Sequence, residues 1–138
     1  MAYVQCRPGL KIALRSDIIQ DRNVQILTAS FPGHPTTTII NMYNDKDHKN
    51  DRASKIIRQL PLALDQPTII TGDWNMHHLL WANQDRVQHD QETTEMVEWL
   101  TQHDFRLINT PGKATCLGHI RNRSLSVLDL IFANKLAT

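Results

Sequence analysis

The chain has 138 residues, and its 15 Lys and Arg residues against 14 Asp and Glu residues give a net charge of +1. This length suits a single domain or part of one, and the shares of hydrophobic (41%) and charged (21%) residues exclude a disordered tail, a collagen-like repeat and a coiled coil. The near-neutral charge excludes binding to nucleic acid by bulk charge, so any such contact has to be local.

Short strands and turns are predicted in the first third of the chain. Apolar and polar residues partly alternate at 10–15 and at 24–28, which predicts two strands with one buried face each. Pro and Gly residues predict a loop at 31–35. The β-branched run at 36–43 then has the length and composition of a buried strand.

Helices and strands are predicted in the rest of the chain. Apolar residues recur every three or four positions from 51 to 64, which predicts a helix capped by Asn50 or Asp51. The further predictions are a strand at 68–71 stopped by Gly72, a helix from about 91 to 103, a strand at 105–109, a turn at 110–113 and a last buried strand at 126–132. This order indicates an α/β or α+β layered domain with a mixed sheet.

The most informative local feature is the strand that leads into Gly-Asp-Trp-Asn at 72–75. If the chain stays extended through Trp74, Asp73 and Asn75 point to the same side. A carboxylate there can accept a proton from water or help to hold a cation, and a carboxamide can bind a phosphate oxygen or that water. Taken alone, this pattern more often makes a turn in which both side chains bond their own backbone.

Two further polar residues accompany apolar strands. Tyr43 ends the run at 36–43, where its phenol could donate a hydrogen bond to an oxyanion, although an aromatic residue at a strand end is more often a packing residue. Asp129 lies within the apolar run at 126–132. Because an unpaired buried charge is costly, Asp129 needs a strong partner or a place at the rim of the sheet.

Four motifs occur in order: Ile-Asn-Met-Tyr-Asn at 40–44, Gly-Asp-Trp-Asn-Met-His-His-Leu-Leu-Trp at 72–81, Leu-Ile-Asn-Thr-Pro-Gly-Lys-Ala-Thr at 107–115 and Ser-Val-Leu-Asp-Leu-Ile-Phe at 126–132. Together they resemble the motifs of the endonuclease/exonuclease/phosphatase superfamily. The resemblance is to the branch that LINE-like, non-LTR retrotransposons encode beside their reverse transcriptase. It covers nearly the whole chain from Lys11 onward.

The resemblance implies a deoxyribonuclease-like fold, in which two stacked β-sheets are flanked by helices. Residues 1–138 would then form a single, partial domain of this kind. The implied reaction is Mg²⁺-dependent hydrolysis of a phosphodiester bond, in which a DNA endonuclease nicks its substrate. DNA is thus the expected partner, a reverse transcriptase domain is expected in the parent protein, and we expect a monomer.

The same resemblance implies roles for single residues. Asp73 would orient or deprotonate the attacking water, Asn75 would fix that water or the scissile phosphate, and Tyr43 would contact the phosphate. Asp129 would align the imidazole of a histidine later in the chain. Thr115 would be a lesser substrate contact.

Two parts of the family pattern have no counterpart in this sequence. The family carries a metal-binding glutamate in a Gln-Glu pair, whereas Gln5 is followed by Cys6, and it closes with Ser-Asp-His, which is absent before Thr138. We therefore expect truncation at both ends, assign no metal ligand, and keep a second hypothesis: a catalytically dead remnant with weak nucleic-acid binding. A phosphatase for a small or lipid substrate is a third hypothesis, which the His-His-x-x-Trp sequence disfavours.

Other candidates are interpreted as structural residues. Adjacent His77 and His78 project in different directions and lack the spacing of a helical metal site, so they are expected at the surface. Trp74 could pack beneath the site. Arg121 and Arg123 could touch a DNA backbone, but a solvated loop is the commoner role of such a cluster.

The expected location is inside the cell, nuclear or cytoplasmic. No apolar run approaches the ~18 residues of a membrane span, and the N-terminus lacks the basic and apolar regions of a secretory signal. Cys6 and Cys116 have no Cys-x-x-Cys spacing and are interpreted as plain thiols. We therefore expect neither secretion nor a membrane partner.

Overall fold

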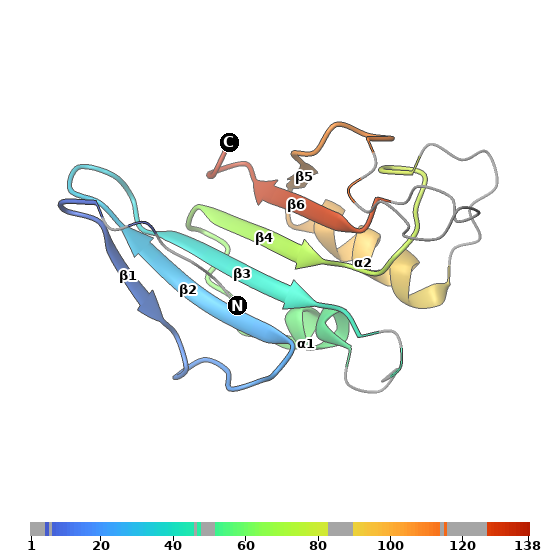
Figure 1. Ribbon diagram of the computed structural model, residues 1–138, viewed down its shortest axis with the longest axis horizontal. Coiled ribbons are helices and arrows are strands. Elements are labelled where there is room, and N and C mark those ends of the chain that lie inside the picture. The colour runs from blue at the N-terminus through green and yellow to red at the C-terminus, as the bar shows by residue number, and fades with distance from the viewer. Residues whose placement is uncertain are drawn as a thin grey trace.

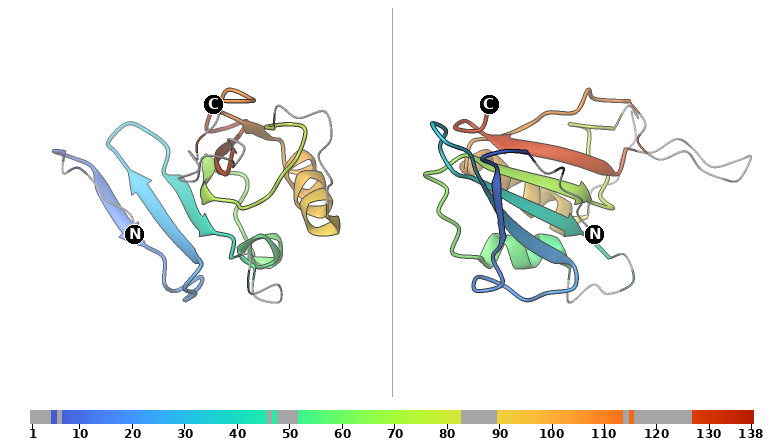
Figure 2. Two further views of the ribbon diagram at one scale, coloured as in Figure 1. Left: turned by 45° about the vertical axis from the view of Figure 1, so that its right-hand side comes forward. Right: turned by 60° about the vertical axis from the view of Figure 1, so that its left-hand side comes forward.

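The computed structural model describes residues 5, 7–45, 47, 52–82, 90–113, 115 and 127–138. These residues form a six-stranded sheet with strand order β1-β2-β3-β4-β6-β5, and both helices lie against the same face of it (Figures 1 and 2). The elements are β1 (Lys11–Leu14), β2 (Val24–Ser30), β3 (Thr37–Tyr43), α1 (Ala53–Gln59), β4 (Thr68–Asp73), α2 (Gln91–Gln102), β5 (Phe105–Leu107) and β6 (Asp129–Asn134).

The sheet is mixed, as the sequence predicts. β3 and β4 run parallel, and the other neighbouring strands run antiparallel. A parallel pair needs a crossover connection, and the chain between β3 and β4 supplies it with α1. Within the described residues, no helix is long and apolar enough to cross a membrane.

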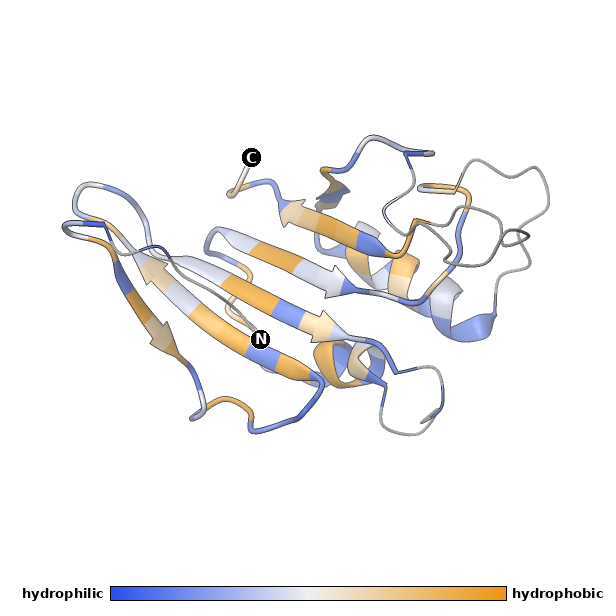
Figure 3. Cartoon of the chain, viewed as in Figure 1, coloured by the Kyte–Doolittle hydropathy of each residue, from blue (hydrophilic) through white to orange (hydrophobic). Residues whose placement is uncertain are grey.

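The core lies between one face of the sheet and the two helices. Ile26, Ile40 and Ile70 pair side by side across β2, β3 and β4, and all three are fully buried. Ile57 of α1 and Met96 of α2 belong to the same buried cluster. Apolar residues recur along all the central strands (Figure 3), so that each strand supplies the core with its alternate side chains.

The first helix is shorter than its apolar periodicity predicts. It ends at Gln59, and Leu60 is extended (φ −70°, ψ 140°), because a residue before proline, here Pro61, disfavours the helical conformation. Leu60 and Leu64 nevertheless pack against the core from the extended segment. The predicted caps Asn50 and Asp51 lie outside the described residues, and Arg52 occupies the N-cap position.

The last strand and β4 also differ from their predicted bounds. β6 begins at Asp129 and ends at Asn134, whereas the apolar run predicts 126–132, and Ser126 lies outside the described residues. β4 continues through Gly72 to Asp73 instead of stopping at the glycine. Both β4 and β6 therefore end further toward the C-terminus than their apolar runs indicate.

Gly72 allows β3 and β4 to approach each other closely. Its φ of +132° is one that side-chain-bearing residues rarely adopt, and a Cβ there would lie 1.9 Å from the carbonyl oxygen of Met42, its partner in the register. The atom in the way belongs to the backbone of β3, so no side-chain movement can relieve the overlap. Only glycine fits this position without shifting one strand against the other.

We expect Gly72→Ala to lower the free energy of unfolding by about 2 kcal/mol or more, because it adds a backbone clash to an unfavourable φ. Gly33→Ala is the matched control, since Gly33 has a φ of +80° but nothing within 4 Å of the added Cβ. The control should lose only the ~1 kcal/mol typical of that φ. Urea unfolding followed by circular dichroism measures both, and equal losses would contradict the importance of the close approach.

Candidate active site

Three strands bring polar residues to the same edge of the sheet. β3 ends with Tyr43 and the parallel β4 ends with Asp73, its register partner. β6 begins with Asp129, which pairs with Asp73 from the other side. Directly paired residues point to the same face, so the three side chains stand in a row on strands ~4.8 Å apart.

This row stands on the face that the helices leave open. The preceding strand residue Met42 is buried in the core, whereas Tyr43 is 49% exposed. In the same way Leu130 is fully buried and Asp129 is exposed. Asp129 therefore lies at the rim of the sheet, one of the two places that the sequence analysis allowed for it.

Asn75 reaches the row through a turn. Its φ of +46° lies in the left-handed region, which asparagine tolerates better than most residues. Its backbone N–H donates to Oδ1 of Asp73 (3.1 Å), and its Nδ2 donates to the backbone carbonyl of Asn44 (3.1 Å). The condition of an extended path from Asp73 to Asn75 is therefore not met, because Asn75 lies beyond the end of β4 and has a positive φ.

The turn alternative is correct for one of the two side chains. Asp73 accepts the N–H two residues further on, which is the hydrogen bond of an Asx-turn. The Asn75 side chain instead bonds the residue after β3, across the sheet. Since one of its two Nδ2 hydrogens is used there, Asn75 presents its Oδ1 and the second N–H to other groups.

Thr115 lies beside the start of β6. Its Oγ1 accepts hydrogen bonds from the backbone N–H groups of Leu128 and Asp129, both at 3.0 Å. These two bonds use both acceptor positions of the hydroxyl, so the hydroxyl proton is what Thr115 can offer to a substrate. Thr115 thereby also fixes the position at which Asp129 enters the sheet.

Two buried tryptophans support the site from beneath. Trp74 is fully buried, its backbone N–H donates to the carbonyl of Leu128 (2.8 Å) and its Nε1 donates to the carbonyl of Leu130 (3.2 Å). Its ring centroid lies 4.8 Å from that of Phe132. Trp81 is also fully buried and donates from Nε1 to the carbonyl of Met76 (3.1 Å). Trp74 therefore packs beneath the site and joins the exit of β4 to β6.

The adjacent histidines take different surroundings. His77 is exposed, whereas the Nδ1 of His78 accepts the backbone N–H of Leu80 (3.1 Å) and its ring lies 5.2 Å from Trp81. His78 thus shapes the turn after Met76. The other polar cluster considered from the sequence, Arg121 and Arg123, lies outside the described residues.

The described residues do not complete a metal site. Asp73 and Asp129 bring two carboxylates to the row, but among described residues no group of three or more His, Cys, Asp or Glu side chains could hold an ion. A site built from these residues alone would therefore depend on water and substrate for most of its ligands.

Two asparagines at the site have no role assigned from the sequence. Asn44 carries the carbonyl that binds Asn75. Asn109 accepts the backbone N–H of Ile131 at its Oδ1 (2.6 Å) and donates from Nδ2 to the carbonyl of Asp129 (3.3 Å), which extends the pairing between β5 and β6. Asn44 lies inside the motif at 40–44 and Asn109 inside the motif at 107–115. Their place in these motifs is the sequence signal that could have identified them.

Residues 37–138 match the model of a family described as Endonuclease-reverse transcriptase, which is more than half of the chain. The chain belongs to this family. Among solved structures it is similar to the "Endonuclease domain of TRAS1, a telomere-specific non-LTR retrotransposon", with a TM-score of 0.71 and 15% identity over 91% of this chain and 54% of that one. No curated protein matches the sequence.

These findings confirm the resemblance and the deoxyribonuclease-like fold class. The expected pair of stacked sheets is not seen among the described residues, which form one six-stranded sheet. The chain spans about half the length of the TRAS1 structure it matches, and at 15% identity that likeness shows the fold alone. The fold is the deoxyribonuclease-like α/β fold that the motifs implied, with a six-stranded sheet and two helices among the described residues. Family and fold together support a nuclease domain.

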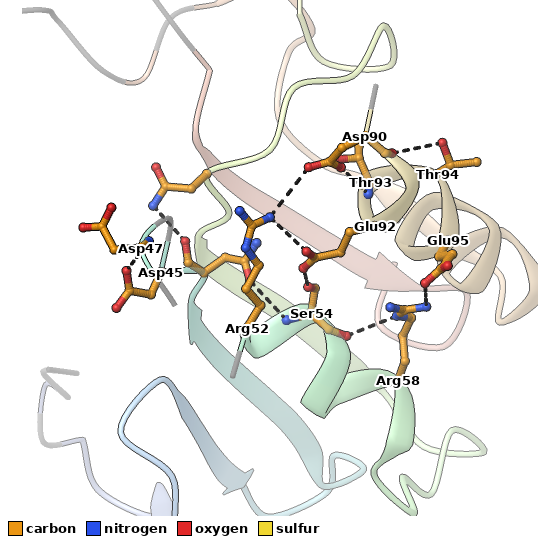
Figure 4. Close-up of polar contacts among 12 residues, drawn as sticks. Asp45, Asp47, Arg52, Ser54, Arg58, Asp90, Glu92, Thr93, Thr94 and Glu95 are labelled. Carbon is orange, nitrogen blue, oxygen red and sulfur yellow. Dashed lines mark hydrogen bonds and ion pairs between the residues drawn. The ribbon is translucent and has the colours of Figure 1, made fainter. Parts of the chain in front are cut away.

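In this endonuclease-reverse transcriptase chain, a polar network joins α1 to α2 (Figure 4). Arg52 donates to Glu92 at 2.9 Å, and the Ser54 hydroxyl also donates to Glu92. The side chains of Arg52 and Glu92 are only 11% and 12% exposed. Because α1 follows the end of β3 in the chain, this network fixes the helix that stands next to the Tyr43 end of the row.

A second ion pair lies further along the same two helices. Arg58 donates to Glu95 at 2.7 Å, and these side chains are 19% and 39% exposed. The hydrogen bond from Arg58, followed by one from Gln91, lowers the pKa of Glu95 below its ordinary value. A lowered carboxyl pKa contributes stability above the unfolded-state pKa of about 4.5, and this contribution is lost as the pH falls through the lower, folded-state pKa.

We expect Glu92→Gln to destabilise the domain by roughly 2 kcal/mol, because it removes the closer and more buried of the two carboxylate partners of Arg52 and leaves the nearly buried guanidinium with Asp90 alone, at 3.7 Å. Glu95→Gln, on the same helix and opposite another arginine, is the control and should cost much less, since exposed pairs contribute little. Thermal and urea unfolding of both variants at pH 7 make the comparison. A larger loss for Glu95→Gln would show that burial does not set the contribution of these pairs.

Proposed function

We propose that the chain is a DNA endonuclease domain of retrotransposon origin, which nicks DNA by Mg²⁺-dependent hydrolysis of a phosphodiester bond. The observation that carries this proposal is the row of Tyr43, Asp73 and Asp129 at one edge of the sheet, in a chain of the endonuclease-reverse transcriptase family. Asn75 bonds Asp73 in the middle of the row and Asn44 beside its Tyr43 end, and Thr115 bonds the backbone of Asp129 at its other end. The proposal extends to the parent protein, in which a reverse transcriptase domain would accompany this one.

Uncharged hydrogen-bond donors are proposed to bind the phosphate. The Tyr43 phenol and the second Nδ2 hydrogen of Asn75 would donate to its nonbridging oxygens, and the Thr115 hydroxyl would be a lesser contact. Such donors suit a site that also contains carboxylates, because they stabilise the phosphate charge without forming ion pairs with Asp73. Asn75 and Thr115 are already held by hydrogen bonds to the backbone, which limits the reorganisation needed when the substrate binds.

The carboxylates are proposed to act on the water. Asp73 would orient the attacking water and accept its proton, and the Oδ1 of Asn75 would accept a second hydrogen of that water. Asp129 would align an imidazole, as the family resemblance implies, from its place opposite Asp73. Bound Mg²⁺ would offset the charge that develops on the phosphoryl and leaving oxygens. The described residues do not complete a site for this ion.

A second candidate function is supported by that same incomplete donor set. A chain with the phosphate-binding residues but too few metal ligands would bind DNA without cutting it. The two functions predict the same DNA-binding surface around Tyr43 and Asn75. Only the endonuclease function predicts that the chain cuts DNA and that this cutting depends on Asp73.

A plasmid assay separates the two functions. The endonuclease function predicts nicking of supercoiled plasmid in Mg²⁺ and not in EDTA, slowed about 10²–10³-fold by Asp73→Ala with little change in DNA binding. A chain with too few metal ligands is expected to show little or no nicking in Mg²⁺. Asp65→Ala is the control, because Asp65 is an exposed carboxylate that precedes β4, whose other end carries the site. It should retain full activity.

The other outcomes are equally specific. DNA binding that Tyr43→Phe and Asn75→Ala weaken, without any nicking by the wild-type chain, would establish the second function. Nicking that survives Asp73→Ala would come from another site or from a contaminant and would overturn the proposed mechanism. A chain that neither binds nor nicks DNA would contradict both functions.

A further inference from the structure

We propose that Asn44 is a positioning residue, which holds the Asn75 carboxamide in the orientation needed at the scissile phosphate. This inference rests on the function proposed above. Asn44 directly follows Tyr43 in the sequence, but its side chain is 1% exposed whereas that of Tyr43 is 49% exposed. At this strand end, Tyr43 therefore faces the proposed substrate side and Asn44 faces the interior.

Hydrogen bonds fix Asn44 from three directions. Its backbone N–H donates to the carbonyl of Asp73 (2.8 Å), and its backbone carbonyl accepts Nδ2 of Asn75 (3.1 Å). Its side-chain Oδ1 accepts the backbone N–H of Ser54 in the first turn of α1 (3.3 Å). A residue held at its N–H, carbonyl and side chain has little freedom to rotate its carbonyl away from Asn75.

The unsatisfied end of the Asn44 side chain supports a role beyond packing. Its Nδ2 is buried and has no hydrogen-bond partner among the described residues. An apolar side chain of similar size would fill the same space without leaving a buried donor unpaired. The asparagine side chain at position 44 contributes the Oδ1 that accepts the backbone N–H of Ser54. This bond keeps the backbone carbonyl of Asn44 in place, and that carbonyl accepts Nδ2 of Asn75.

This anchor decides which end of the Asn75 side chain faces the substrate. A carboxamide without a partner can turn by 180° about its last torsion and exchange its oxygen with its nitrogen. Because the carbonyl of Asn44 accepts a hydrogen from Nδ2, the Oδ1 of Asn75 is held on the other side. A water molecule needs an acceptor there, so loss of the anchor should lower the rate of the chemical step more than substrate binding.

The first experiment tests the geometry without measuring activity. In ¹⁵N NMR spectra of the wild-type chain, we expect the Asn75 side-chain NH₂ group to show one hydrogen with slow exchange. Asn44→Leu, which lacks the acceptor for Ser54, should speed that exchange and also the exchange of the Ser54 amide. Asn44→Asp keeps an acceptor next to the N-terminal turn of α1 and should retain the wild-type pattern. Unchanged Asn75 exchange in Asn44→Leu overturns the proposal.

The second experiment measures the kinetic effect on nicking. We expect Asn44→Leu to lower kcat about tenfold or more while KM for DNA stays within about twofold, and Asn44→Asp to restore most of the loss. In an Asn75→Ala background, Asn44→Leu should lower kcat no further, because Asn44 acts through Asn75. Multiplied effects in the double variant would assign Asn44 a purely structural role and overturn the inference.

A matched control accounts for loss of stability. Asn134 is likewise buried, and its side chain accepts the N–H of Thr68 and donates to Gln66 at the other end of β4. Asn134→Leu should therefore lower the melting temperature as Asn44→Leu does, yet leave kcat unchanged below that temperature. If the wild-type chain does not nick DNA at all, the proposed function fails, and the NMR experiment still decides whether Asn44 holds Asn75.

Discussion

The register between β3 and β4 is the constraint on which the site depends. The two strands stay paired to their last residues, so that Tyr43 stands opposite Asp73. A slip of one residue would turn the carboxylate toward the core and place Gly72 opposite the tyrosine. The buried partners Ile40 and Ile70 oppose such a slip, because it would carry apolar side chains out of the core. The close approach at Gly72 then favours the same alignment at the end of the strands.

Once this register is set, the remaining site residues follow from backbone hydrogen bonds. Trp74 enters the core directly after Asp73 and binds the carbonyls of Leu128 and Leu130, which brings Asp129 into the row. The turn at Asn75 follows, since the chain has to leave the sheet where the buried tryptophan ends the strand. The site is therefore assembled by strand pairing and by one buried aromatic residue, not by direct attraction among its polar side chains.

The strands and the row of site residues could be predicted because they depend on local patterns. Alternation of apolar residues locates the strands, and the motifs place Tyr43 and Asp73 at the ends of two of the strands that form the row. Asp129 was predicted within the strand at 126–132, whereas it begins β6. The turn at Asn75 was among the predicted alternatives, because its bond to Asp73 is local. The bond from the Asn75 side chain to Asn44 and the role of Asn44 could not be predicted, because they depend on a partner that the fold brings from another element. The early end of α1 was open to prediction from Pro61, but the apolar residues at 60 and 64 concealed it by continuing the helical spacing.

Several unfavourable local features of the described structure lie at this row, although the buried Nδ2 of Asn23 and Nε of Arg52 also lack a partner among the described residues. Asp73 and Asp129 stand directly opposite each other, where like charges destabilise a sheet. Asn75 has a positive φ, and the buried Nδ2 of Asn44 lacks a partner among the described residues. Asp104 also has a positive φ, but it follows α2, where such a residue commonly ends a helix. A sheet edge shaped by stability alone would avoid these costs together, so their concentration beside Tyr43 favours a functional site over a structural turn.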